Sequence, residues 1–477
     1  MTSFYDVGAL LLKEYKEKSP WKYENTYSEE PYYSLKKRID TLLAGNPLVI
    51  GAPGVPGAGK TTFYAYILAK HLKDIICNEI YKHRYLYVYI APTNDLVRDF
   101  FEKFVKFLKG VLGIKCDPAV LSRRLRVYGS KIMAPSFPKL LKAIDEDVVL
   151  VASTDWQRVS ARILTSKEQF YFIDEASRMT FVRLFIPIAD AIARGESRGE
   201  IKGFAVIGDE NQAVGLTEEE RRLLLLHSIR KLYEDSRNHV YVVPLTVSWR
   251  LPKETAEPIK IGFYDGNLEG RGTPLKIPNE HEQIKRILAE IKGICRKYIS
   301  YIEQFLGIAS EQPLVHLELS EHFQKGDRYD IGRAKLSWCL AYVVSHLTNK
   351  KIAVVTPYTK MAFAIRMLGE IPNVSTTTVA SYLGRENNII IATFGKEQAG
   401  SCNTYYMQDP FSFNVQLSRQ LNALYTIGSA EMLRVSTEYC KAEISREKWK
   451  TDAIVGIEKM RRTVETLLSM EHVVLKI

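Results

Sequence analysis

Gly-Val-Pro-Gly-Ala-Gly-Lys-Thr-Thr occupies residues 54–62, between a short apolar run and an apolar stretch with helical spacing, Phe63–Leu72. The sequence fits the Gly-x-x-x-x-Gly-Lys-Thr pattern of a phosphate-binding loop between a strand and a helix. Backbone N–H groups of such a loop surround phosphates at the positive end of the helix. A glycine-rich surface turn is the alternative, but it does not explain the flanking strand and helix. The predicted nucleotide contacts are Gly54, Gly57, Ala58, Gly59, Lys60, Thr61 and Thr62, with Lys60 on the β- and γ-phosphates and Thr61 on Mg²⁺.

Two acidic residues, Asp174 and Glu175, directly follow the apolar run Phe170–Ile173. If this run is a strand of a parallel sheet, both acids lie at the carboxyl edge, where such sheets present catalytic groups. We expect Asp174 to hold Mg²⁺ through its water shell and Glu175 to orient or deprotonate the attacking water. The alternative is that the carboxylates cap a helix. Their position behind the glycine loop favours catalysis.

A third polar strand end is Gly208-Asp-Glu-Asn-Gln212, which follows the apolar run Gly203–Ile207. A glutamine next to the γ-phosphate can sense it by hydrogen bonding. The same letters also describe an ordinary turn. In register behind the two preceding motifs, Gln212 is a predicted catalytic residue.

The composition limits the class of protein. Of the 477 residues 46% are hydrophobic and 25% charged, which is typical of a globular protein of two or three domains. No apolar run is long enough to span a bilayer and residues 1–18 lack a signal-peptide core, so we expect a cytoplasmic protein without a membrane partner. For a viral or plasmid gene this would be the host cytoplasm. Six cysteines lie far apart without a Cys-x-x-Cys pair, which argues against a zinc site or a disulfide framework.

Positive charge is concentrated in Arg98–Lys142, where eleven Lys or Arg face three acidic residues in a chain of net charge +11. Such an excess suggests a polyanion, most often nucleic acid; a solvated charged face is the alternative. Within the segment, Asp99–Lys109 has a helical period with a phenylalanine stripe that we expect in the core. The predicted phosphate contacts are Arg123, Arg124 and Arg126, which flank a predicted strand.

Strands and helices alternate along most of the chain, which predicts α/β folding with mainly parallel sheets. The pattern restarts in the second half, so two nucleotide-binding-type cores are expected, only the first with a glycine loop. The predicted strands are 48–51, 85–90, 124–128, 148–151, 170–173, 203–207, 240–244, 314–319, 351–355, 388–392 and 424–427. The predicted domains are a helical extension (1–45), a first core (46–244, with the basic segment 98–142) and a second core (245–477), which carries a helical insertion at about 278–311 and C-terminal helices at about 436–477.

The order of these motifs resembles that of a superfamily 1 helicase, of the branch containing the nonsense-mediated-decay helicases and the helicases of positive-strand RNA viruses. Six more segments support the resemblance: Ala91–Asn94, Val247–Pro252, Gly262–Gly266, Thr356–Tyr358, Thr378–Glu386 and Asn414–Arg419. The resemblance covers residues 48 to about 428 and implies two tandem RecA-like P-loop domains. Two departures are the absence of Gln from Ser28–Asn46, which puts strict ATP preference in doubt, and Leu383 in place of a usual glutamine.

The resemblance also implies roles for individual residues. Arg250 and Arg419 match arginines that reach the γ-phosphate from the second domain, so that hydrolysis depends on domain closure. Trp249 matches an aromatic residue that stacks on adenine, and Glu386, near Gly384, matches a residue that contacts the ribose. Positions that touch the nucleic-acid backbone are matched by Pro92, Thr93, Asn94 and Thr378.

Together these features predict an ATP- and Mg²⁺-dependent helicase or translocase on single-stranded DNA or RNA, with 5′-to-3′ polarity implied by the resemblance. It is expected to work as a monomer, with replication or RNA-processing proteins as possible partners. One alternative is an NTP-driven remodeller that strips proteins without unwinding duplexes. The other is a P-loop kinase or switch ATPase, which the first 210 residues alone do not exclude. The choice between DNA and RNA stays open, because no motif fixes contacts to the 2′-OH.

Overall fold

The structure is a computed structural model, and it divides into two compact units. Unit 1 comprises Met1–Gly54, Gly59–Glu210 and Glu219–Leu245, and unit 2 comprises Val55–Ala58, Asn211–Glu218 and Thr246–Ile477. The described residues are 25–77, 84–115, 117–128, 147–154, 167–180, 200–216, 220–221, 223–236, 238–319, 330–395, 401–445 and 451–477. Each unit is described by itself below.

Unit 1 is built on a seven-stranded sheet in which every neighbouring pair is parallel. Its order, β3-β4-β2-β5-β6-β1-β7, places the strand before the glycine loop between β6 and β7. Apolar runs form these strands because helices cover both faces of a parallel sheet. The strands are β1 (Leu48–Pro53), β2 (Tyr85–Ala91), β3 (Leu125–Tyr128), β4 (Leu150–Thr154), β5 (Glu168–Ile173), β6 (Ile201–Gly208) and β7 (Val240–Val242).

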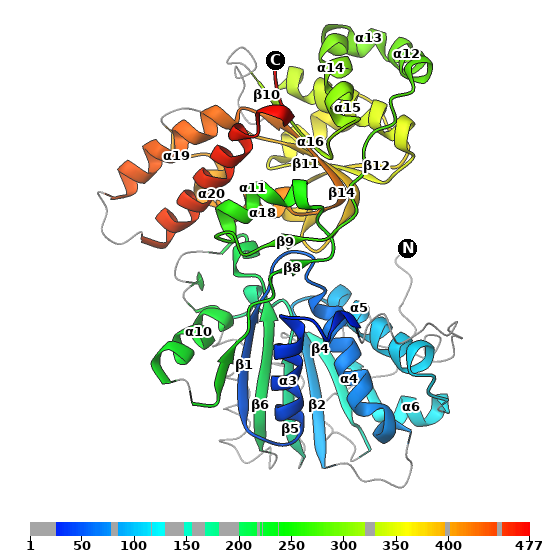
Figure 1. Cartoon of the computed structure of the whole chain (residues 1–477), viewed down its shortest axis with the longest axis vertical. Coiled ribbons are helices and arrows are strands. Elements are labelled where there is room, and N and C mark those ends of the chain that lie inside the picture. The colour runs from blue at the N-terminus through cyan, green and yellow to red at the C-terminus, as the bar shows by residue number, and fades with distance from the viewer. Residues whose placement is uncertain are drawn as a thin grey trace. The chain divides into compact units, whose positions relative to one another are not determined.

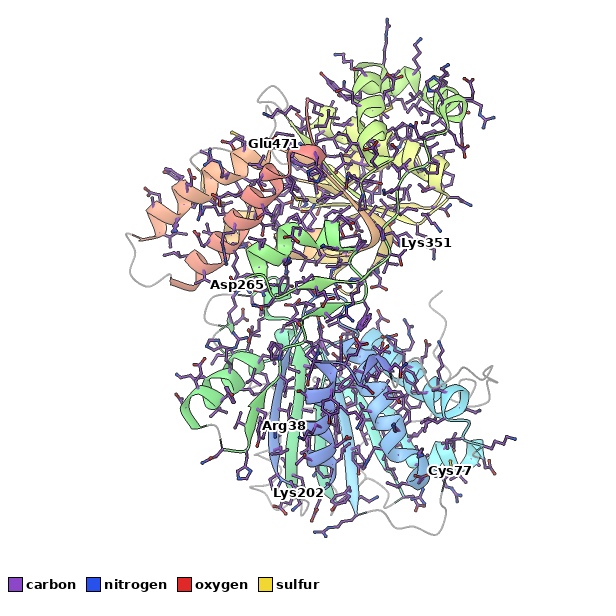
Figure 2. The ribbon with its side chains drawn as sticks, viewed as in Figure 1. Arg38, Cys77, Lys202, Asp265, Lys351 and Glu471 are labelled. Atoms are coloured by element: carbon purple, nitrogen blue, oxygen red, sulfur yellow. A yellow bond between two sulfur atoms is a disulfide. The ribbon has the colours of Figure 1, made fainter. Side chains whose placement is uncertain are left out.

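The helices of unit 1 lie against this sheet (Figure 1). In α5 the predicted phenylalanine stripe is buried, with Phe100, Phe101 and Phe104 all at 0% exposure. At the sheet edge Arg38 of α3 lies over the Tyr241 ring, 3.9 Å from its centroid (Figure 2). The helical elements are α3 (Tyr32–Leu43), α4 (Lys60–Ile76), α5 (Asn94–Lys106), the π-helix η1 (Phe107–Val111), α6 (Pro118–Arg124), η2 (Ala176–Arg178) and α10 (Leu225–Ser236).

Unit 2 contains a second parallel sheet of six strands in the order β12-β11-β13-β14-β10-β15. The strands β8 and β9 form a separate two-stranded parallel sheet, and β8 begins directly after the chain passes into unit 2 at Thr246. The strands are β8 (Val247–Ser248), β9 (Glu269–Gly270), β10 (Leu314–Glu318), β11 (Ile352–Thr356), β12 (Val374–Thr378), β13 (Asn387–Thr393), β14 (Gln420–Gly428) and β15 (Val474–Lys476). The short element η3 (Glu210–Gln212) follows β6 of unit 1 and ends in unit 2.

Three groups of helices surround the sheet of unit 2. The predicted insertion forms α12 (His281–Glu290), α13 (Lys292–Cys295), η4 (Arg296–Tyr298) and α14 (Ile299–Ala309). At the C-terminal end, α19 and α20 run side by side (orange and red in Figure 1), and Arg462 of α20 pairs with Asp265 at 2.7 Å. The other helices are α11 (Lys253–Phe263), α15 (Ile331–Thr348), α16 (Thr359–Arg366), η6 (Ala380–Tyr382), α17 (Tyr405–Gln408), α18 (Phe411–Leu417), α19 (Ala430–Ser445), α20 (Thr451–Ser469) and η7 (Glu471–Val473). None of the helices in the described part of the chain has the length and hydrophobicity needed to cross a bilayer.

The predicted fold class, α/β with two mainly parallel sheets, is confirmed. Three local predictions were wrong. The C-terminal segment predicted to be helical at about 436–477 also contains the strand β15. Arg124 ends α6 instead of beginning a strand, and β12 was missed because its sequence, Val-Ser-Thr-Thr-Thr, carries little of the hydrophobicity expected of a sheet strand. β12 lies at the edge of its sheet, where polar Ser and Thr side chains meet solvent.

The cysteines also contradict the sequence prediction. Cys295 of α13 and Cys339 of α15 form a disulfide with Cα atoms 6.0 Å apart, and Cys402 pairs with Cys440 of α19 at 5.3 Å. Both bridges lie within unit 2. Sequence separations of 44 and 38 residues hide these pairings, because tertiary packing and not local sequence brings each pair together.

Candidate nucleotide-binding and hydrolysis site

The glycine loop joins the end of β1 to the first turn of α4. Gly59, with φ of 69°, is the N-cap of α4, and Lys60 is the first residue of the helix. The left-handed conformation at Gly59 favours glycine because a β-carbon would strain it. The Lys60 Nζ donates to the Gly54 carbonyl oxygen at 3.2 Å, which folds the side chain back over the loop. The predicted strand, turn and helix start are therefore all present.

Thr61 and Asp174, the two residues expected to hold Mg²⁺, contact each other although 113 residues separate them. The Thr61 Oγ1 donates to Asp174 Oδ2 at 2.5 Å, because α4 begins and β5 ends at the same edge of the sheet. Oxygen ligands of this kind suit Mg²⁺, which keeps most of its own waters and takes one or two protein oxygens. The donor set therefore fits this ion. The described residues contain no cluster of three or more His, Cys, Asp or Glu side chains that would form a separate protein metal site.

Tyr89 is a site residue that the sequence did not reveal. Its hydroxyl donates to Asp174 Oδ2 at 2.9 Å from the neighbouring strand β2, and its ring stacks on Phe100 with centroids 3.6 Å apart. A tyrosine in an apolar strand is expected to be a core residue. Its contact with Asp174 becomes visible only from the pairing of β2 with β5. Asp174 thus accepts hydrogen bonds from two side-chain hydroxyls.

Burial controls the charge of Asp174. The residue is 1% exposed, and this burial raises the pKa of its carboxyl above the ordinary aspartate value. The hydrogen bonds from Thr61 and Tyr89 and the charge of Lys60 act in the opposite direction, and the nearby Glu175 raises the pKa further. A bound cation would favour the ionised carboxylate, because an adjacent positive charge lowers a carboxyl pKa.

Glu175 occupies a constrained backbone position. Its φ of 49° is left-handed, which is uncommon for a residue with a side chain, and its N–H donates to Asp174 Oδ1 at 2.8 Å. The neighbouring strand end is close, since a β-carbon on Gly208 would lie 2.8 Å from the backbone nitrogens of Ala176 and Ser177. Backbone strain of this kind often accompanies function.

The centre of the loop, Val55–Ala58, belongs to unit 2, where it contacts the segment after β8. The Trp249 N–H donates to the Gly57 carbonyl at 3.0 Å, and a β-carbon on Gly57 would lie 2.4 Å from Cβ of Arg250. Gly57 also has a φ of 70°, so no other residue fits easily. The Trp249 ring is 39% exposed and carries the Arg271 guanidinium 5.2 Å from its centroid. An exposed indole held beside the loop can stack on a base.

Arg250 contacts two of the motifs that the resemblance singled out. Its Nη1 lies 3.2 Å from Glu386 Oε2, and its Nη2 donates to the Ser418 carbonyl at 2.6 Å. Its Nε is buried and has no hydrogen-bond partner among the described residues. A buried guanidinium N–H without an acceptor fits an anionic ligand such as phosphate.

Gln212 and Arg419 are brought together within unit 2. Arg419 Nη2 donates to Gln212 Oε1 at 2.9 Å, and Gln212 Nε2 donates to Ser418 Oγ at 3.3 Å. Gln212 and Arg419 are 5% and 6% exposed. The sequence predicted both side chains but neither their mutual hydrogen bond nor Ser418, whose adjacency to Arg419 was the only available signal.

The residues predicted to touch a nucleic-acid backbone occupy strand ends in both units. In unit 1, Pro92, Thr93 and Asn94 follow β2, and Thr93 caps α5 by accepting from the Leu96 N–H at 3.4 Å. In unit 2, Thr378 ends β12, and its Oγ1 donates to Ser381 Oγ at 3.0 Å. These contacts position the side chains at the carboxyl edges of the two sheets.

The three predicted arginines of the basic segment differ in environment. Arg123 is exposed and Arg126 half-buried. Arg124 is 4% exposed, and its guanidinium donates to the Asp147 carbonyl at 3.1 Å. Because this hydrogen bond holds the Arg124 side chain in the interior, the proposed nucleic-acid interface does not include Arg124. The remainder of the segment, 129–142, lies outside the described residues.

A glycine loop at a helix start, a Thr–Asp pair at the neighbouring strand end and a parallel sheet define a P-loop nucleoside triphosphatase. Comparisons with known proteins narrow this class. Residues 36–197 match the family model of DEAD/DEAH box helicases, and residues 228–431 match the model of an AAA domain. Both matched segments agree with the resemblance of the sequence motifs to the superfamily 1 helicases.

The chain is similar to the DNA replication ATP-dependent helicase/nuclease DNA2 of several vertebrates. Identity is 22% over 398 residues with the Bos taurus protein, 23% over 403 with that of Xenopus laevis and 22% over 401 with that of Homo sapiens. Each match covers 80% of this chain and 35% of the relative, so the chain spans about a third of the length of these relatives. A solved structure of a variant of S. cerevisiae Dbp5 bound to RNA and ADP BeF₃ aligns with 88% of this chain and 93% of its own, at 13% identity and a TM-score of 0.34.

Proposed function

We propose that this protein is an ATP-driven motor that moves 5′-to-3′ along a single strand and unwinds duplexes, working as a monomer. The observation that supports this best is the cluster in unit 2, where Gln212 accepts from Arg419 and donates to Ser418, whose carbonyl accepts from Arg250. A kinase or a simple switch ATPase needs no such coupled arginine pair. The family comparisons support nucleotide hydrolysis on nucleic acid, and the polarity rests on the resemblance of the motifs.

The hydrolysis step rests on unit 1. The N–H groups of the loop and Lys60 bind the phosphates of ATP, while Thr61 and Asp174 would hold Mg²⁺, which would supply positive charge to the phosphate oxygens. Glu175 orients the attacking water and accepts its proton. Tyr89 and Thr61 keep the Asp174 carboxylate oriented through their hydrogen bonds.

The coupling step rests on the arginine cluster. Guanidinium groups neutralise charge that develops during phosphoryl transfer, and their planar donors bind phosphate oxygens in pairs. In the structure Arg250 is paired with Glu386 and Ser418, and Arg419 with Gln212. We infer that bound ATP replaces these internal acceptors, so that nucleotide state changes the contacts within unit 2.

The proposed track is single-stranded DNA. The curated relatives are named as DNA replication enzymes, which favours DNA over RNA. The backbone contacts would come from Pro92, Thr93, Asn94 and Thr378. The exposed Arg123 and half-buried Arg126 would add salt-dependent contacts to phosphate.

Arginine variants test the proposal. Arg250→Ala and Arg419→Ala should each lower kcat for ATP by roughly a hundredfold or more, because removing one preorganised charge donor costs a catalyst about that much. The matched control is Arg296→Ala, an exposed arginine in the helical insertion of the same unit, which should leave kcat unchanged.

Full turnover in both cluster variants would contradict the motor and favour a kinase or switch ATPase. A strand-displacement assay run beside a protein-displacement assay then separates unwinding from protein removal. Displacement of protein without separation of strands would replace the helicase by a remodeller.

A further inference from the structure

A shallow hollow of about 680 Å³ lies in unit 2 between the N-terminal turns of α15 and the length of α16. Three large apolar side chains line it, each more than half exposed: Ile331 at 63%, Phe363 at 56% and Met367 at 69%. Single exposed apolar residues are normal on protein surfaces, whereas several lining one hollow mark an interaction site. None of these residues belongs to the nucleotide site or to the motifs described above.

Three cations line the same hollow. They are Lys335 on α15 and Lys360 and Arg366 on α16, and the lining residues that the structure describes include no acidic residue. Within the part of the chain that the structure describes, none of the three forms an ion pair or side-chain hydrogen bond. The hollow therefore combines an apolar floor with uncompensated positive charge, and its electrostatic complement is an acidic group.

The two helices that form the hollow are fixed to each other. The Trp338 indole of α15 donates to the Gly369 carbonyl, just beyond α16, at 2.9 Å, and the Ser345 hydroxyl of α15 donates to the Pro372 carbonyl at 2.5 Å. Between them Ala334 and Ala362 are almost fully buried. A groove held in place before binding loses less conformational entropy when a ligand is ordered on it.

We propose that this groove docks an acidic amphipathic helix of a partner protein. Apolar side chains at i, i+3, i+4 and i+7 would lie against Ile331, Phe363 and Met367, while flanking Asp or Glu residues meet the three cations. A small molecule is disfavoured because such sites bury most of their ligand, whereas these side chains are more than half exposed. A nucleic-acid strand is disfavoured because Phe363 is the one aromatic side chain among the described residues that line the hollow, while bases stack on several aromatic faces.

The test uses the full chain and two fluorescein-labelled synthetic helical peptides. Both carry leucine at i, i+3, i+4 and i+7; one has glutamate and the other lysine at the flanking positions. Fluorescence anisotropy should show saturable binding of the glutamate peptide, and binding of the lysine peptide that is at least about tenfold weaker. Raising the ionic strength should weaken the glutamate peptide's binding, because exposed charges are screened.

Variants assign the binding to the groove. The double variant Phe363→Ser, Met367→Ser should lower the affinity for the glutamate peptide by about tenfold or more, because the loss of an apolar anchor contact lowers affinity by about that factor. The matched control is Tyr439→Ser on α19, an exposed aromatic residue (44%) outside the groove, which should leave the affinity unchanged. The wild type, the groove double variant and the Tyr439→Ser control should hydrolyse ATP at the same rate. A failure of this proposal can therefore be told apart from a failure of the motor proposal.

Several outcomes would overturn the inference. One is equal binding of both peptides, or binding that the groove variant does not change. Another is a groove variant that binds a single-stranded oligonucleotide more weakly but binds the glutamate peptide as well as the wild type does. This result would assign the surface to nucleic acid. A third is self-association of the wild-type protein that the groove variant no longer shows. This result would assign the groove to contact with a second copy of the same chain.

Discussion

Replacing Tyr89 by phenylalanine removes one hydroxyl and keeps the ring that stacks on Phe100. The lost hydrogen bond to Asp174 measures 2.9 Å and lies in the interior. A hydrogen bond to a charged group contributes about 1.5–3 kcal/mol. Because this bond favours the ionised carboxylate, its loss should raise the pKa of Asp174 in the variant.

The direction of the pH effect follows from this change. Burial already raises the pKa of Asp174, so the folded protein loses stability as pH rises from the ordinary aspartate value through the raised one and the carboxyl ionises. Tyr89→Phe raises the pKa further. The variant should therefore be about 1.5–3 kcal/mol less stable than the wild type at neutral pH, and the difference should shrink in acid, where both carboxyls are protonated. Catalysis needs the ionised Asp174, so the acidic limb of the pH profile of kcat/KM should move to higher pH.

The assay is steady-state ATP hydrolysis across pH, with denaturant unfolding of the same proteins. Tyr171→Phe is the matched control, because Tyr171 is equally buried on the adjacent strand β5 but donates to the neutral Gln169 at 2.8 Å. The control should lose some stability without moving the acidic limb. Profiles that coincide for both variants and the wild type would refute the role given to Tyr89.

Three further predictions concern separate parts of the chain. Lys60→Ala should abolish ATP hydrolysis and translocation together while leaving nucleotide-free strand binding largely intact, as gel-shift and hydrolysis assays would show; loss of strand binding would contradict this. Glu318→Gln should destabilise the protein by about 2–4 kcal/mol at neutral pH, because a buried carboxylate that accepts several hydrogen bonds is replaced. Burial raises the pKa of Glu318, but the hydrogen bond and charge of His316, 2.6 Å away, hold that pKa below the ordinary value. The stability difference between wild type and Glu318→Gln should therefore disappear as pH falls through the lowered pKa, which unfolding experiments in acid would measure. Serine at both Cys402 and Cys440 should lower the free energy of unfolding by about 2–4 kcal/mol, measured against the oxidised wild type, and an unchanged value would show that the bridge does not constrain the unfolded chain.

Local signals in the sequence were sufficient for most of the fold. The apolar run before the glycine loop and the helical spacing after it predicted β1 and α4, since loop chemistry and hydrophobic period agree there. The helical insertion around residues 278–311 was also predicted, because its charged helical pattern lacks proline at interior positions. Polar strands such as β12 were missed, since their hydrophobic signal is weak.

Contacts between distant residues were mostly beyond reach. Thr61 and Asp174 could be assigned to one Mg²⁺ site because each belongs to a motif of known chemistry, but their direct hydrogen bond was not predicted. Tyr89 was missed because nothing in its own neighbourhood distinguishes it from a core tyrosine. The disulfides were missed for a related reason, since helix packing and not spacing places Cys295 beside Cys339. Arg124 was assigned to the surface by its charge, although its helix end turns it inward to Asp147.

The central claim is that hydrolysis at the glycine loop is coupled to a nucleic-acid strand. The most direct measurement is steady-state ATP hydrolysis by the full chain with Mg²⁺, alone and with saturating single-stranded DNA or RNA. The account predicts stimulation of about tenfold or more by DNA, a smaller effect of RNA, and no activity in Lys60→Ala under any condition. Hydrolysis that neither nucleic acid changes would contradict it.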